Sequence, residues 1–201
     1  MARTAQEESP TKDKLLDAAQ ALVLAKGFAA TTVDDICASA GLTKGSFFHY
    51  FESKDVLGQE LLERYCRDAR ARHDALFGDD TDPLKRIYHY LDTTAEAARS
   101  GELKKGCLLG SFAQELADEN KGIRETCAKA FAGWAGRFAG ELSLAKAKHA
   151  PRAKFDPDGV AEHFVAIMEG AALLCKTQQD CAVIGRSLKH FKAYVQSLFG
   201  A

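Results

Sequence analysis

The sequence predicts an all-α protein with a small N-terminal domain and a larger C-terminal helical bundle, about nine helices in all. Apolar residues recur at spacings of three and four along most of the chain, which is the period of an amphipathic helix. Val, Ile and Thr never gather into alternating runs typical of strands. The four prolines, at positions 10, 83, 151 and 157, are expected in loops.

The first predicted helix begins near Thr11, and Gly27 supplies a left-handed stop at its end. Two short helices follow, over residues 33–40 and 44–50. Thr32 suits the N-cap of the first, Gly41 breaks it, and Thr43 suits the N-cap of the second. A helix, a short turn and a second helix therefore follow one another in residues 31–57.

Longer amphipathic segments follow this unit and predict the remaining helices. The first begins at Lys54 and is ended by the GDDTDP run at 78–83, and the others are expected near 83–99, 106–118, 121–148, 157–177 and 180–198. We predict a domain over residues 1–57 and a second domain over residues 58–201.

Composition limits the function classes. The chain has 201 residues, 46% hydrophobic and 27% charged, as in a folded globular protein. No apolar stretch approaches the roughly 18 to 20 residues of a membrane helix, and the start MARTAQEESPTKDK lacks a signal-peptide core. We expect a cytoplasmic protein without membrane contact. A net charge of −1 argues against nucleic-acid binding by bulk attraction, so any DNA contact must be local.

Cysteine spacing argues against metal and disulfide frameworks. The six cysteines show no CxxC pairing and no clustered histidines, so we expect reduced thiols, no metal and no cofactor. They are Cys37, Cys66, Cys107, Cys127, Cys175 and Cys181.

The segment TTVDDICASAGLTKGSFFHYFESKDVL, residues 31–57, predicts a helix-turn-helix. In such a unit the second helix enters the major groove, while flanking groups hold phosphates. Lys44 and Ser46 can reach base edges, and Gly45 permits close approach of the backbone. The predicted DNA-binding residues are Thr32, Thr43, Lys44, Gly45, Ser46, His49, Tyr50 and Lys54. Phe47 and Phe51 are assigned to a miniature core.

The run from Gly41 to Phe51, GLTKGSFFHYF, resembles the signature of the TetR family of bacterial transcriptional repressors. The resemblance extends from about Lys14 to Leu57. Two positions depart: Phe48 stands where many members carry Tyr, and Tyr50 where they carry His. The first change removes a hydroxyl that could hold a phosphate.

This resemblance implies a homodimer that binds a pseudo-palindromic double-stranded DNA operator, with the last two helices of each copy packing as a four-helix bundle. It also implies a C-terminal domain that senses a small molecule, and a regulator rather than an enzyme. No catalytic residue is predicted.

The segment ELKKGCLLGSFAQEL, residues 102–116, contains a candidate sensor. Cys107 follows two lysines and is expected in the first turn of a helix, and both features favour a thiolate. The segment resembles a subgroup of the family that responds to electrophiles and hypochlorite, the repressors of N-ethylmaleimide reductase among them, in which the cysteine of a similar GCLLG run senses. Lys176 is similar to a basic partner of that thiol.

Three alternatives stay open. Cys107 could instead be a buried small residue, with a noncovalent lipophilic effector held in an apolar pocket. The predicted pocket residues are Phe112, Leu116, Trp134, Phe138, Phe164 and Met168. The second alternative is a thiol-dependent enzyme, for which Cys107 is the sole supporting residue. The third is a helical interaction protein whose only activity is dimerisation.

Overall fold

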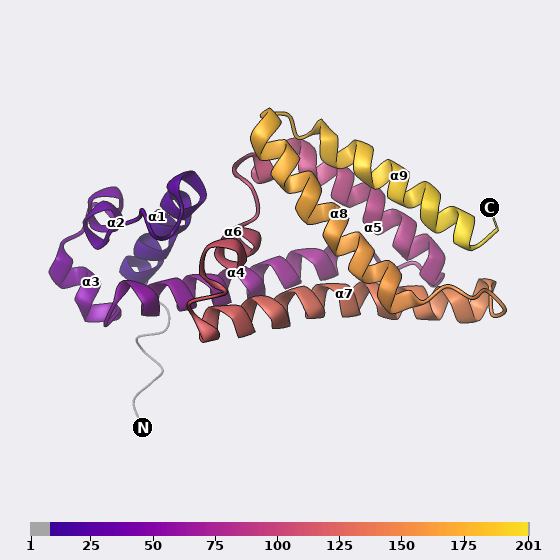
Figure 1. The fold of residues 1–201 in the computed structure, drawn as a ribbon, viewed down its shortest axis with the longest axis horizontal. Coiled ribbons are helices and arrows are strands. Elements are labelled where there is room, and N and C mark those ends of the chain that lie inside the picture. The colour runs from indigo at the N-terminus through magenta and orange to yellow at the C-terminus, as the bar shows by residue number, and fades with distance from the viewer. Residues whose placement is uncertain (1–8, 201) are drawn as a thin grey trace, which may run out of the picture. The chain divides into compact units, whose positions relative to one another are not determined.

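The protein is described by a computed structural model over residues 9–200, with only the backbone at positions 100 and 102. The expectation about the first eight residues of the chain lies outside this range. Within it, every regular element is a helix, as predicted (Figure 1). The α-helices are α1 Pro10–Lys26, α2 Val33–Ala40, α3 Lys44–Tyr50, α4 Lys54–Leu76, α5 Pro83–Ala97, α6 Leu108–Leu116, α7 Lys121–His149, α8 Pro157–Gln178 and α9 Ala182–Leu198. Two short 3₁₀ helices, η1 Ala98–Ser100 and η2 Glu102–Lys105, precede α6.

The chain forms two compact units. Unit 1 runs through Arg67 and adds Leu108–Cys127, whereas unit 2 comprises Asp68–Cys107 and Ala128–Ala201. This division differs from the predicted boundary between residues 57 and 58. The reason is that α6, far along the chain, packs against α1 in unit 1. No helix of residues 9–200 is long and apolar enough to cross a membrane.

The predicted caps of the two short helices are confirmed. The Thr32 hydroxyl accepts a hydrogen bond from the Asp35 amide, and the Asp35 carboxylate accepts one from the Thr32 amide, which completes a capping box. Thr43 caps α3 through the Ser46 amide. Gly41 adopts the left-handed conformation, with φ 66° and ψ 35°, and ends α2.

Three local expectations were wrong. Pro10, Pro83 and Pro157 begin helices rather than lying in loops, because the first turn needs no amide donor from proline. Gly27 has φ 85° but ψ 164°, so it is not a left-handed helical stop. Finally, α6 begins at Leu108, which leaves Cys107 just before the helix rather than in its first turn.

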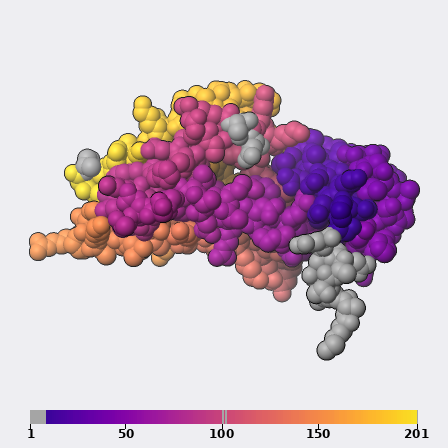
Figure 2. Space-filling view, turned by 180° about the vertical axis from the view of Figure 1, so that it is seen from behind, coloured from indigo at the N-terminus to yellow at the C-terminus, as the bar shows by residue number. Residues whose placement is uncertain are grey.

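Unit 2 is built around an aromatic core. The rings of Phe138 and Phe164 stack with centroids 4.6 Å apart, and Phe77 stacks on Tyr90 at 4.2 Å. Phe191 of α9 packs against the same cluster. In this unit α9, yellow in Figure 2, lies alongside α5, in agreement with their contacts.

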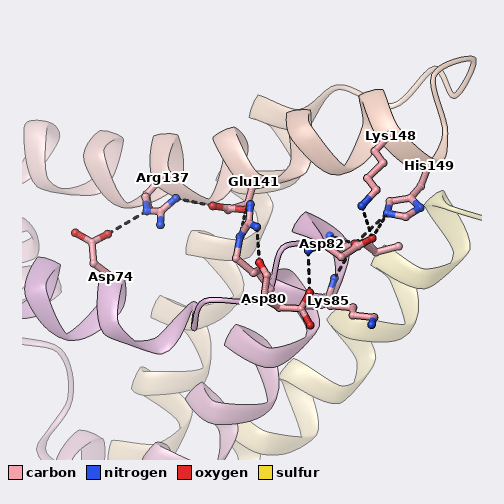
Figure 3. A network of polar contacts seen from close by, with 10 residues as sticks. Asp74, Asp80, Asp82, Lys85, Arg137, Glu141, Lys148 and His149 are labelled. Atoms are coloured by element: carbon pink, nitrogen blue, oxygen red, sulfur yellow. Dashed lines mark hydrogen bonds and ion pairs between the residues drawn. The ribbon is translucent and has the colours of Figure 1, made fainter.

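A charged network joins α5 and α7 at the edge of this core (Figure 3). The Glu141 carboxylate is only 4% exposed, and Arg86 donates two hydrogen bonds to its Oε2, at 2.9 and 2.6 Å. Arg137 donates to Oε1 at 2.7 Å and also to Asp74 at 3.1 Å. A buried carboxylate is tolerated because both of its oxygens are paired.

Asp82 connects the start of α5 with the end of α7. Its carboxylate caps α5 through the Leu84 and Lys85 amides and pairs with Lys148 and His149, each at 2.9 Å. The Lys148 ammonium, followed by the His149 hydrogen bond, holds the pKa of Asp82 well below its usual range although burial opposes this. Helix capping and an ion pair are thus combined in one side chain.

A polar cluster packs against the aromatic core. The Tyr90 hydroxyl is hydrogen-bonded to His73 Nδ1 at 2.8 Å and accepts from Trp134 Nε1 at 2.9 Å, while the His73 and Trp134 rings stack at 4.6 Å. Burial, assisted by the nearby Arg72 charge, lowers the pKa of His73 to about 4. His73 is therefore neutral in the folded protein at neutral pH.

This neutral histidine makes stability depend on pH. Between pH 6.5 and pH 5 the unfolded chain binds a proton at His73 that the native state does not, so stability falls as pH falls, by about 2 kcal/mol. Denaturant unfolding should show this loss in the wild type, and His73→Gln should reduce it. Substitution of the exposed His89 by Gln serves as control; equal pH dependence in wild type and His73→Gln would contradict the assignment.

Candidate functional site

The recognition helix α3 has a buried side and an exposed side. Phe47 and Phe51 are 0% exposed, as predicted, and their rings contact each other with centroids 5.6 Å apart. The opposite side is open to solvent, and its exposed residues are Lys44, Gly45, Phe48 and His49. This helix therefore presents one small surface, which we call the α3 face, defined by these four residues.

Lys44 is the cation of the α3 face. Its ammonium pairs with the Asp34 carboxylate of α2 at 2.8 Å, and both side chains are largely exposed. The hydrogen bond from Lys44 to Asp34 raises the pKa of the lysine. An exposed pair of this kind contributes little to stability, so Lys44 can exchange its carboxylate for a DNA group at small cost.

Two predicted contact residues serve as caps. The hydroxyl oxygens of Thr32 and Thr43 each accept a hydrogen bond from a backbone amide in the first turn of the following helix. The Ser46 hydroxyl lies 3.1 Å from that of Thr43. Ser46 is half-buried, so it belongs to the cap rather than to the α3 face. Their DNA contacts stay predictions.

Tyr50 and Lys54 have partners inside unit 1. The Tyr50 hydroxyl is hydrogen-bonded to the Ser9 hydroxyl at 2.9 Å. The Lys54 ammonium donates to the carbonyl oxygens of Phe28 and Thr31, each at 3.0 Å, and lies 4.5 Å from the Phe28 ring centroid. The structure thus gives Lys54 a role in holding a loop, beside the phosphate contact that the sequence predicts.

Phe48 was missed as a candidate contact. Its side chain is 56% exposed, on the same side of α3 as Lys44 and His49. Apolar side chains recognise the thymine methyl group in the major groove. The signal was present in the sequence, because Phe47 and Phe51 share one side of a helix and Phe48 cannot join them.

The candidate sensor lies in unit 2, directly before α6. Cys107 is half-buried, and its thiol is hydrogen-bonded to the Glu169 carboxylate of α8. Burial raises the pKa of the Glu169 carboxyl, and this hydrogen bond opposes the rise. Glu169 was not foreseen, since only folding brings α8 to the loop before α6.

Lys176 lies close to this loop. A Cβ at Gly106 would be 3.2 Å from Lys176 Cδ and 4.0 Å from its ammonium nitrogen. Gly106 has φ 92°, a conformation that favours glycine. The structure therefore brings the predicted partner Lys176 next to the residue that precedes Cys107.

The expectation that all cysteines are reduced thiols was wrong. Cys175, at the end of α8, and Cys181, directly before α9, form a disulfide. Their six-residue separation has no CxxC pattern, and the turn between α8 and α9 brings them together. Cys37, Cys66, Cys107 and Cys127 form no disulfide within the described residues.

The predicted pocket residues are divided between the units. Phe138, Phe164 and Met168 are buried in the core of unit 2, and Trp134 packs against it. Phe112 belongs to unit 1, where its ring contacts Phe28 with centroids 5.3 Å apart, and Leu116 lies in the same unit. The noncovalent pocket stays a prediction.

A three-helix unit with a capped, exposed α3 defines a helix-turn-helix DNA-binding protein. Residues 15–61 match the family "Bacterial regulatory proteins, tetR family", and residues 83–191 match "Tetracyclin repressor-like, C-terminal domain". The chain belongs to the TetR family of transcriptional regulators.

Relatives of known function agree with this assignment. The repressor DhaR of Mycobacterium sp. (strain GP1) is 27% identical, covering 90% of this chain and 87% of its own. The regulator AcuR of Cereibacter sphaeroides is 30% identical over 88% of this chain and 81% of its own. The crystal structure of reduced Escherichia coli NemR matches with a TM-score of 0.77 at 25% identity, covering 91% of this chain and 96% of that one. The chain is thus a DNA-binding transcriptional regulator similar to known repressors.

The α3 face gives a direct prediction for DNA binding. Lys44→Ala should weaken binding to the protein's own upstream DNA about tenfold, because a groove or phosphate contact is lost. Fluorescence anisotropy over a salt series measures both the affinity and the slope of log K against log[salt]. Lys154→Ala, an exposed lysine in the loop between α7 and α8, removes the same charge and should leave the affinity unchanged. Equal weakening by both variants would show a general charge effect.

Proposed function

We propose that this protein is a cytoplasmic homodimeric repressor that leaves its operator when Cys107 is modified by an electrophile or oxidant. The α3 face carries the DNA-binding part of this proposal: a capped seven-residue helix with a buried aromatic side and an exposed side bearing Lys44. Regulators of this family bind DNA operators. A dimer bound over a promoter blocks access to that DNA, so we propose repression rather than activation.

Exposed apolar residues on α8 and α9 support dimerisation. Leu173 and Leu174 of α8 are 52% and 43% exposed, and Tyr194 of α9 is 42% exposed. Tyr194 also lines a groove of ≈ 320 Å³ together with His163 and Phe191. Apolar side chains on two adjacent helices suit a second copy of the chain, which would form a four-helix bundle.

A charge on this surface should prevent dimer formation. Tyr194→Glu should convert the dimer into a monomer at micromolar concentration, because two-fold symmetry places two carboxylates in one apolar interface. Sedimentation velocity measures the change. Leu144→Glu introduces the same charge at a 56% exposed leucine of α7 and should leave the dimer intact. If Tyr194→Glu remains a dimer, the dimer interface does not include this part of α8 and α9.

The surroundings of Cys107 support covalent sensing. The thiol is only half-buried, so reagents can reach it. Lys176 adds a positive charge next to Gly106. In the reaction with a maleimide, sulfur bonds to one alkene carbon, and the other carbon takes up a proton. The added group enlarges a side chain that directly precedes α6.

Operator release by N-ethylmaleimide tests this proposal. We expect the reagent to release the wild type from its upstream DNA in anisotropy measurements, and Cys107→Ser to stay bound. Cys66→Ser, a second half-buried cysteine, should behave like the wild type. Release that is equal in wild type and Cys107→Ser would exclude Cys107 as the sensor. Failure of the unmodified protein to bind at low salt would contradict the repressor itself.

A further inference from the structure

The loop between α1 and α2 has backbone groups that no helix satisfies. The amides of Phe28 and Ala29 follow the end of α1 and have no backbone carbonyl partner in the loop. Glu115, in the last turn of α6, supplies the partner: its carboxylate accepts from the Phe28 amide at 2.8 Å and from the Ala29 amide at 2.6 Å. Residues about 86 positions apart are thereby joined within unit 1.

The carbonyl groups of the same loop are held from another helix. The Lys54 ammonium, at the start of α4, donates to Phe28, Ala29 and Thr31 oxygens at 3.0, 3.4 and 3.0 Å. The loop amides therefore donate to the Glu115 carboxylate, and the loop carbonyl oxygens accept from the Lys54 ammonium. Hydrogen bonds to charged partners are shorter and stronger than those between neutral groups.

Glycines make room for this arrangement. A Cβ at Gly27 would lie 3.1 and 3.3 Å from the two Glu115 carboxylate oxygens, and one at Gly58 would lie 2.5 Å from Phe28 Cε2. The Phe28 ring packs on Phe112, which stands one turn before Glu115 on α6. Helix α6 thus contacts the loop at two points, through an aromatic ring and through a carboxylate.

The held loop leads directly into the DNA-binding helices. Thr32 follows it as the N-cap of α2, and α2 packs against α3. Lys26 at the end of α1 also bonds to Asp35 of α2 at 2.7 Å, so the two ends of the loop are tied together. The position of the loop consequently determines where α2 begins and, because α2 packs against α3, the orientation of α3.

We propose that Glu115 is a positioning residue for DNA binding, which holds the α1–α2 loop and thereby sets the orientation of α3. The inference rests on the proposed function, operator binding through the α3 face. Helix α6 begins at the residue after Cys107, and Glu115 lies in its last turn. Cys107 and Glu115 are therefore at opposite ends of the same helix.

Two measurements on Glu115→Ala test this role. Amide exchange followed by nuclear magnetic resonance should speed up about tenfold or more at Phe28 and Ala29, since these amides lose their acceptor. Affinity for the upstream DNA, measured at a temperature where both proteins are fully folded, should fall about tenfold. Glu115→Gln keeps one acceptor oxygen and should lie between the wild type and Glu115→Ala.

The control is Glu119→Ala, which removes an exposed carboxylate just beyond α6 and should change neither measurement. Faster exchange with unchanged affinity would overturn the positioning role and leave Glu115 with a local structural one. Unchanged exchange would overturn the hold on the loop itself. If Glu115→Ala does not fold, Glu115→Gln decides by the same criteria. A wild type that does not bind DNA would contradict the proposed function, and the exchange data would still decide whether Glu115 holds the loop.

Discussion

The burial of two aromatic rings, Phe47 in the seven-residue helix α3 and Phe51 at its C-cap, is the constraint on which the DNA-binding unit depends. An isolated helix as short as α3 is unstable in water. The unfavourable free energy of helix nucleation exceeds the stabilisation from its few hydrogen bonds. Phe47 and Phe51 supply the missing stabilisation by complete burial. Once these two rings are fixed, the helical period determines that Lys44, Phe48 and His49 face solvent.

The polar contacts of unit 1 add direction to this packing. Apolar contacts hold α3 in place but tolerate small rotations, whereas caps and charged hydrogen bonds have fixed geometry. Thr32 and Asp35 fix the start of α2, and Glu115 and Lys54 fix the loop before it. A major-groove reader needs such precision, because base contacts depend on hydrogen-bond geometry.

Unit 2 combines an aromatic core with a group of polar side chains near Cys107. Stacked rings around Phe138 and the paired carboxylate of Glu141 make its interior tightly held. Near the loop that precedes α6, the Cys107 thiol contacts the Glu169 carboxylate, Lys176 lies next to Gly106, and a disulfide joins α8 to α9.

The sequence was enough to predict the all-helical fold, the caps of α2 and α3 and the residues of α3 that face inward, because these depend on neighbours three or four positions away. The family signature from Gly41 to Phe51 likewise needs only adjacent positions. Only the tertiary structure decided that Glu115 holds the α1–α2 loop, that Glu169 meets Cys107, and that Cys175 pairs with Cys181. Each of these contacts joins elements through packing, and no periodicity along the chain specifies which packed surfaces meet.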